Sequence, residues 1–142
     1  MLFISKRDIH KIDQRLIQNA VKNAYDLVLN NSYNMPDRIH VENEKNTLLL
    51  MPCFSNNFFA TKLVSVFPDA PKYDQPVVNG LLVLADNRSG KPLAIMDGAA
   101  VTAQRTGAVG GLGVDRLTPE NIETAGILGA GVQGLSQARY LL

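Results

Sequence analysis

The chain has 142 residues, of which 46% are hydrophobic, and its 14 Lys and Arg nearly balance its 13 Asp and Glu, for a formal net charge of +1. This length and hydrophobic content are enough for one domain with a core. The charges are spread along the chain, so nothing in them predicts nucleic acid or an anionic membrane surface as a partner. No apolar run approaches the roughly 18 residues of a membrane span, and residues 1–12 carry charges where a signal peptide needs its apolar core. We therefore expect a cytoplasmic protein whose partners are small molecules or a second copy of itself.

The first third of the sequence predicts a short strand followed by two helices. Leu2–Ile4 is apolar enough for a strand, and Ser5 with Asp8 can cap a short helix over residues 7–11. A second helix begins near Asp13, because apolar residues recur there at three- and four-residue spacing while polar residues fill the other face. These apolar positions are Leu16, Ile17, Ala20, Val21, Ala24, Tyr25 and Val28. We expect a surface helix that covers a core and ends in the Asn-rich stretch that follows it.

The middle of the sequence changes to a strand-like pattern. Five β-rich runs are separated by turn-forming residues, of which Asn87-Arg88-Ser89-Gly90 gives a strong hairpin signal. The runs are Arg38–Val41, Asn46–Met51, Ala60–Phe67, Val77–Asp86 and Leu93–Met96. The loops that join them are too short for crossover helices, so the pairing should be mainly antiparallel.

A glycine-rich helix is predicted next, from Gly98 to about Arg116, with Asp97 as its cap. Each glycine inside a helix costs about 0.5–1 kcal/mol relative to alanine, so the small residues need a reason. One interpretation is close backbone approach to a cofactor or a neighbouring helix; the other is tight helix packing or a break near Gly110-Gly111. Thr118-Pro119-Glu120-Asn121 then resembles a cap with proline at the first position of a helix.

The last stretch carries a dinucleotide-binding pattern. A strand-like run, Thr124–Leu128, enters Gly129-x-Gly131-x-x-Gly134, and a helix can follow. Gly129 would allow a tight turn, Gly131 would let a pyrophosphate approach the backbone, and Gly134 would let helix and strand pack closely. The alternative is an ordinary strand-to-helix turn. With one strand and a short helix, the tail is expected to be loosely packed in the isolated chain.

One cysteine and two histidines limit the other chemistry. Cys53 can form no internal disulfide, and one cysteine with two histidines makes no metal-ligand spacing, so we expect no metal site. A small buried thiol is the preferred interpretation of Cys53, and a structural histidine that of His40.

Four motifs in a fixed order resemble those of the ornithine cyclodeaminase/mu-crystallin family. They are Arg38-Ile39-His40, Met51-Pro52 with Lys62 ten residues after the proline, Asp97-Gly98-x-x-x-Thr102-x-x-Arg105-Thr106, and Ile127-Leu128-Gly129-Ala130-Gly131-Val132-Gln133-Gly134. The resemblance covers essentially the whole chain. It implies an α/β fold with a mixed α+β substrate-binding and dimerisation domain, residues 1–117, followed by the truncated start of a Rossmann NAD(P)-binding domain, residues 118–142. It also implies a homodimer, and that this sequence is the N-terminal portion of a longer protein.

The resemblance assigns roles to three basic residues. Arg38 and Lys62 would hold the substrate, Lys62 also acting in catalysis by adding charge or by donating to the carbonyl or imine that is reduced. Arg105 would lie at the cofactor diphosphate, near the substrate carboxylate. A planar guanidinium suits a carboxylate because it can donate two parallel hydrogen bonds. Without the resemblance, each would be interpreted as a surface charge.

The same resemblance assigns residues to NAD or NADP. The cofactor-binding residues would be Arg105, Thr106, Gly129, Gly131, Val132, Gln133 and Gly134. Thr102, on the same helical face as Arg105, is a weaker candidate, because a helical threonine often bonds to its own backbone.

Leu49 bears on the choice of reaction. In ornithine cyclodeaminases an acidic residue stands two positions before the Met-Pro pair, and here that position is Leu49. We therefore expect an NAD(P)-dependent oxidoreductase of small amino or imino acids, similar to the ketimine reductase and alanine dehydrogenase branches. The alternatives are an ornithine cyclodeaminase, an ammonia lyase that converts ornithine to proline with NAD, and a non-catalytic dimerising fragment.

Overall fold

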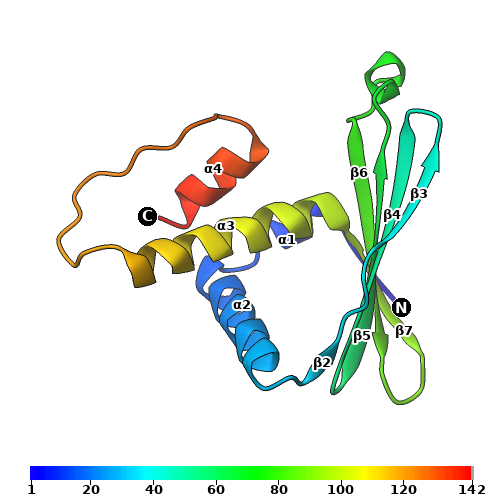
Figure 1. Cartoon of the computed structure of the whole chain (residues 1–142), viewed down its shortest axis with the longest axis horizontal. Coiled ribbons are helices and arrows are strands. Elements are labelled where there is room, and N and C mark those ends of the chain that lie inside the picture. The colour runs from blue at the N-terminus through cyan, green and yellow to red at the C-terminus, as the bar shows by residue number, and fades with distance from the viewer. Residues whose placement is uncertain (142) are drawn as a thin grey trace.

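The computed structural model describes residues 1–141. A sheet stands at one side of the molecule, and the long helix α3 leads away from it with three further helices beside it (Figure 1). The strands are β1 Leu2–Ile4, β2 Tyr33–Asn34, β3 Ile39–Asn43, β4 Asn46–Ser55, β5 Phe58–Val66, β6 Val78–Asp86 and β7 Pro92–Asp97. The helices are α1 Lys6–Ile9, α2 Gln14–Leu29, the 3-10 turn Ala70–Tyr73, α3 Gly98–Leu117 and α4 Val132–Arg139. None of the helices among these residues is both long enough and apolar enough to cross a membrane.

The seven strands form one mixed sheet. Its order is β1-β7-β6-β5-β4-β2, and β3 also pairs with β4. Every pair is antiparallel except β1 with β7, which confirms the mainly antiparallel pairing expected from the short loops. β4 continues past its predicted end at Met51 and includes Pro52, which pairs with Thr61 of β5. On the side of β4 away from β5, β3 pairs with residues 46–50 and β2 with residues 54–55, so among residues 1–141 Pro52 has a partner strand on one side only. A sheet tolerates proline at such an edge position.

Side-chain caps begin α1, α2 and α3, and those of α1 and α3 were predicted as caps. Ser5 and Asp8 form a capping box at α1. The Arg15 N–H donates to Asp13 Oδ1 at 2.7 Å at the start of α2, and the Ala100 N–H donates to Asp97 Oδ1 at 2.8 Å at the start of α3. Each acceptor satisfies a backbone donor that the first helical turn leaves without a partner.

Small residues in α3 serve helix packing against α4. A Cβ on Gly107 would lie 2.6 Å from the Ser136 hydroxyl and 2.6 Å from the Tyr140 ring, and one on Gly111 would lie 2.6 Å from the Tyr140 carbonyl oxygen. The helix runs from Gly98 to Leu117 without interruption, so a break near Gly110-Gly111 is wrong. Packing of α4 on these positions also contradicts the expectation that the whole tail is loosely packed.

The segment between α3 and α4 differs from its prediction. Residues 118–131 contain neither the helix expected after Thr118 nor the strand expected at Thr124–Leu128. Thr118 ends α3 instead of beginning a new helix, since its N–H and its hydroxyl both donate to the Val114 carbonyl oxygen, at 3.1 and 2.5 Å. A strand requires a neighbour to satisfy its backbone groups, and no strand among residues 1–141 lies beside this segment.

Candidate functional site

Lys62 lies in the middle of the sheet, on the side where α3 begins. The register aligns Met51, Lys62, Leu82 and Met96 in one row across four strands. Directly opposed residues project to the same face of a sheet, and extending the β3–β4 register by one position sets Arg38 opposite Met51. Arg38 and Lys62 therefore belong to one face.

The start of α3 is held close to that face by two glycines. A Cβ on Gly98 would lie 2.8 Å from the backbone of Gly80 in β6, so only glycine allows the approach. As a result, the first turns of α3, with Thr102 and Arg105, stand over the row that contains Lys62.

Thr102 links the helix to Lys62. The Thr102 hydroxyl donates to the Gly98 carbonyl oxygen at 2.7 Å, the bond to its own helix that was expected. Its oxygen also accepts from Lys62 Nζ at 3.5 Å, at the long end of the hydrogen-bond range. The ammonium group of the lysine is thus directed toward α3, across 40 positions of sequence.

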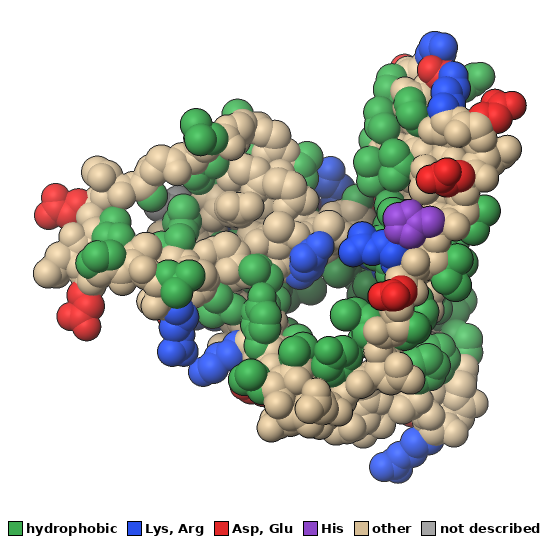
Figure 2. Space-filling view, viewed as in Figure 1, with side chains coloured by type: hydrophobic (Ala, Val, Ile, Leu, Met, Phe, Trp, Pro, Cys, Tyr) green, Lys and Arg blue, Asp and Glu red, His purple; other side chains and the backbone are tan. Residues whose placement is uncertain are grey.

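Both charges that perturb Lys62 are positive. Burial lowers the pKa of the half-buried Lys62 below its ordinary value of 10.5, and the guanidiniums of Arg105 and Arg38 lower it further. The ion pairs formed within residues 1–141 use other basic side chains. Figure 2 shows basic side chains beside a histidine where the helices meet the sheet, with acidic side chains above and below the histidine. The structure brings the three predicted substrate-binding residues together, and none of them forms an ion pair with a carboxylate of residues 1–141.

The predicted cofactor residues occupy the next part of α3 and the start of α4. The Thr106 hydroxyl oxygen is buried, with no hydrogen-bond partner among the described residues. Gly129 has φ of +98°, and a Cβ on Gly134 would clash with the Gly129 carbonyl, so the turn requires glycine at both positions. The first helical bond of α4 runs from Leu135 N–H to Gly131 O.

That bond leaves the N–H groups of Val132, Gln133 and Gly134 as the open donors of the first turn. The N-cap residue of α4 is Gly131, which has no side chain that could block access to these donors. Free N–H groups at a helix N-terminus, together with an unpartnered buried hydroxyl, suit a phosphate-bearing cofactor.

Two further features lie outside these motifs. Cys53 was expected to be buried and is half-buried, and its thiol donates to the neighbouring Phe54 carbonyl oxygen at 3.9 Å. Sequence reasoning missed a polar chain in which the Tyr140 hydroxyl donates to Gln104 Oε1 at 2.8 Å and Gln104 Nε2 lies 3.1 Å from His10 Nδ1. No local pattern could indicate it, because its bonded pairs are 94 and 36 positions apart.

Known proteins resemble the chain over almost all of its length. Residues 5–141 match the ornithine cyclodeaminase/mu-crystallin family. An alanine dehydrogenase of Archaeoglobus fulgidus is 34% identical over 123 residues, which are 87% of this chain and 38% of the relative. The structure of an archaeal alanine dehydrogenase, described as a dimer with bound NAD, superposes with a TM-score of 0.91 at 31% identity, covering 99% of this chain and 44% of that one.

A second solved structure has the same relation to the chain. The Thermococcus litoralis Δ1-pyrroline-2-carboxylate reductase, in complex with NADH and L-proline, superposes with a TM-score of 0.87 at 34% identity and covers 99% of this chain and 45% of that one. The chain therefore spans less than half the length of these relatives.

Proposed function

The chain belongs to the ornithine cyclodeaminase/mu-crystallin family, and we propose that the protein is an NAD(P)-dependent oxidoreductase of small amino or imino acids. In this proposal residues 1–117 form the substrate-binding and dimerisation domain, and residues 118–142 begin the cofactor domain. The proposed protein is cytoplasmic, and in that compartment the single cysteine, Cys53, stays reduced.

The observation that carries the proposal is the cluster of Arg38, Lys62 and Arg105, which has no carboxylate partner within the described residues. A 2-oxo or 2-imino acid supplies the missing negative charge. Arg38 and Arg105 would take its carboxylate, and Lys62 would then face the carbonyl oxygen or imine nitrogen.

Substrate binding would also prepare Lys62 for proton transfer. In the free protein, burial and the two guanidiniums oppose its charged form and lower its pKa. A bound carboxylate offsets the guanidiniums and raises the pKa of Lys62 again, so that the lysine can hold the proton that the carbonyl or imine requires. Thr102 keeps the amine in place through its hydroxyl oxygen.

NAD(P), when bound, supplies hydride transfer to or from the substrate carbon. The residues that would hold it are the first-turn donors Val132, Gln133 and Gly134 together with the Thr106 hydroxyl. The glycines of the turn let the backbone approach the diphosphate, and Arg105 would contribute charge between diphosphate and substrate.

Leu49 favours this reaction over cyclodeamination. It pairs with His40 and Val64 and lies two positions from Met51, so it belongs to the same face of the sheet as Lys62. The site therefore has an apolar side chain where a cyclodeaminase has an acid, and lacks that proton shuttle.

The opposite face of the sheet supports the homodimer. Ile39, Leu50, Leu63 and Leu81 form a row across four strands there. Ile39, Leu63 and Leu81 are 52%, 37% and 50% exposed, an unusual density of open apolar side chains for a sheet face in water. Burying this face against a second copy would remove it from solvent, and the archaeal alanine dehydrogenase is likewise described as a dimer.

The test is a calorimetric titration of the chain with pyruvate and with Δ1-pyrroline-2-carboxylate. We expect Arg38→Gln to weaken binding by about tenfold or more, because a hydrogen-bonded charge is lost, and the exposed turn variant Arg88→Gln to leave it unchanged. Equal affinity in both variants would contradict the assignment. Release of ammonia from ornithine, with no net oxidation or reduction of the nicotinamide, would indicate the cyclodeaminase instead.

A further inference from the structure

A cavity of about 620 Å³ lies on the other side of α3 from Lys62. His10, Ile12, Asp13, Gln14, Arg15, Gln104 and Arg139 line it. Gln104 is two positions after Thr102, a rotation of about 200° around a helix axis, so the two side chains leave α3 in nearly opposite directions. The cavity is thus separate from the site of Arg38, Lys62 and Arg105.

The wall of this cavity is built by an ordered polar chain. Gln104 is only 7% exposed and has both ends of its amide engaged. The Tyr140 hydroxyl, whose pKa is raised by burial, keeps its proton and donates it to Gln104 Oε1. Gln104 Nε2 must then donate to His10 Nδ1, and the proton of neutral His10 is carried by Nε2. The imidazole of His10 therefore has its Nε2–H as a donor on the ring nitrogen that does not contact Gln104.

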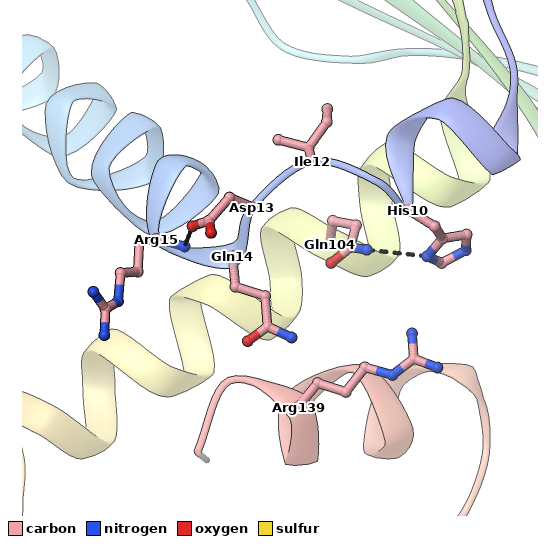
Figure 3. A pocket seen from close by; sticks show the side chains of 7 residues that line it. All are labelled: His10, Ile12, Asp13, Gln14, Arg15, Gln104 and Arg139. Atoms are coloured by element: carbon pink, nitrogen blue, oxygen red, sulfur yellow. Dashed lines mark hydrogen bonds between the residues drawn. The ribbon is translucent and has the colours of Figure 1, made fainter.

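Two arginines give the cavity its charge. Arg15 and Arg139 take part in none of the ion pairs that the described residues form. Asp13, the single carboxylate in the lining, already accepts the Arg15 N–H as the cap of α2. Figure 3 shows Arg139 extending from α4 toward the end of the cavity where His10 and Gln104 lie. An adjoining cavity of about 560 Å³ shares His10 and Arg139 and adds one basic residue, Lys6, and one acidic residue, Asp97, to the lining.

We propose that this cavity is a second binding site, for a small molecule that bears a phosphate or carboxylate group. Arg139 would supply a two-point contact to the anion and His10 its Nε2–H, while Arg15, which points away from them in Figure 3, would add positive charge from the other end of the cavity. The lining comes from the α1–α2 connection, from α3 and from α4. A bound anion would therefore tie the first helix of the cofactor domain to the N-terminal segment, and its binding would stabilise that packing.

The test is a two-dimensional NMR titration of the isotope-labelled chain with inorganic phosphate and, separately, with citrate, at ionic strength held constant with sodium chloride. We expect saturable shifts of the Gln104 side-chain amide with at least one of the two anions. Arg139→Gln should weaken the affinity by about tenfold or more, and the exposed α3 variant Arg116→Gln should not change it.

A second variant separates this site from the substrate site. Arg38→Gln should leave the response of the Gln104 amide unchanged, whatever it does to binding of 2-oxo acids, so the two proposals can fail independently. The inference is overturned if neither anion shifts the Gln104 amide. It is also overturned if folded Arg139→Gln binds as tightly as the unaltered chain, or if the shifts disappear with Arg38→Gln.

Discussion

Replacement of Gly107 by alanine tests the contact between α3 and α4. The new methyl group would lie 2.6 Å from both the Ser136 hydroxyl and the Tyr140 ring, and 2.8 Å from the Ser136 carbonyl oxygen. Overpacking of this kind costs about 1–3 kcal/mol, whereas alanine gains about 0.5–1 kcal/mol over glycine inside a helix. The net expectation for Gly107→Ala is therefore a loss of about 1 kcal/mol in the free energy of unfolding, within limits of about 0–2.5 kcal/mol.

Gly113 supplies a matched control within the same helix. A Cβ there meets nothing within 4 Å, so Gly113→Ala keeps only the helix gain and should stabilise the protein by about 0.5–1 kcal/mol. Urea denaturation followed by circular dichroism gives both values. The two variants should differ in sign, and the difference isolates the α3–α4 contact from the change in helix propensity.

One result would refute this reasoning. If Gly107→Ala stabilises the chain as much as Gly113→Ala does, α4 does not pack on α3 as described. Limited proteolysis adds a second measurement, because displacement of α4 by the new methyl group should expose the chain from residue 118 onward to cleavage.

Three further substitutions have defined outcomes. Asp97→Ala removes the acceptor of the Ala100 N–H and should lower the free energy of unfolding by about 1 kcal/mol, measured by thermal unfolding, with the exposed Asp115→Ala as a control that stays near zero. Lys62→Met should raise stability at pH 7 by a small amount that solvent screening limits, since it removes a charge that burial and two guanidiniums oppose. The sign follows from the lowered pKa of Lys62, because between that pKa and 10.5 the unfolded chain binds more protons than the folded chain. The stability of the unaltered protein should therefore rise with pH in this window, and that of Lys62→Met should not. Urea denaturation at pH 7 and pH 10 measures both. Tyr140→Phe deletes the donor to Gln104 and should cost about 1 kcal/mol in urea denaturation; no change in stability would mean that the Tyr140–Gln104 bond is not formed.

Local chemistry predicted much of the fold. Asp13 and Asp97 mark helix starts because a carboxylate satisfies the donors of a first turn, and this requirement depends on only three or four neighbouring residues. Six of the seven strands were predicted from β-rich runs between turn-forming residues, to within a few residues at their ends, whereas the two-residue β2 was missed. The position of Lys62 near Arg38 and Arg105 came from the motifs of a family, and the register then supplied the geometry.

Long-range context decided the features that sequence reasoning missed. The run at Thr124–Leu128 has the composition of a strand, but composition does not provide the partner strand that its backbone requires. The bond between Gln104 and His10 joins residues 94 positions apart, and neither residue type indicates the other. Thr118 was equally suited to begin a helix or to end one, and its bonds to Val114 settle the matter.

The uninterrupted course of α3 has a consequence for how this sequence can change in length. Thr102 and Arg105 face Lys62 whereas Gly107 faces Ser136 and Tyr140, and inserting one residue before them would turn all three by about 100° around the helix axis. The interval from Asp97 to Gly111 is therefore closed to insertions and deletions, whereas residues 118–131, which lie outside any helix or strand, can vary in length without altering what faces Lys62. Homologous chains should keep the first spacing constant and differ in the second.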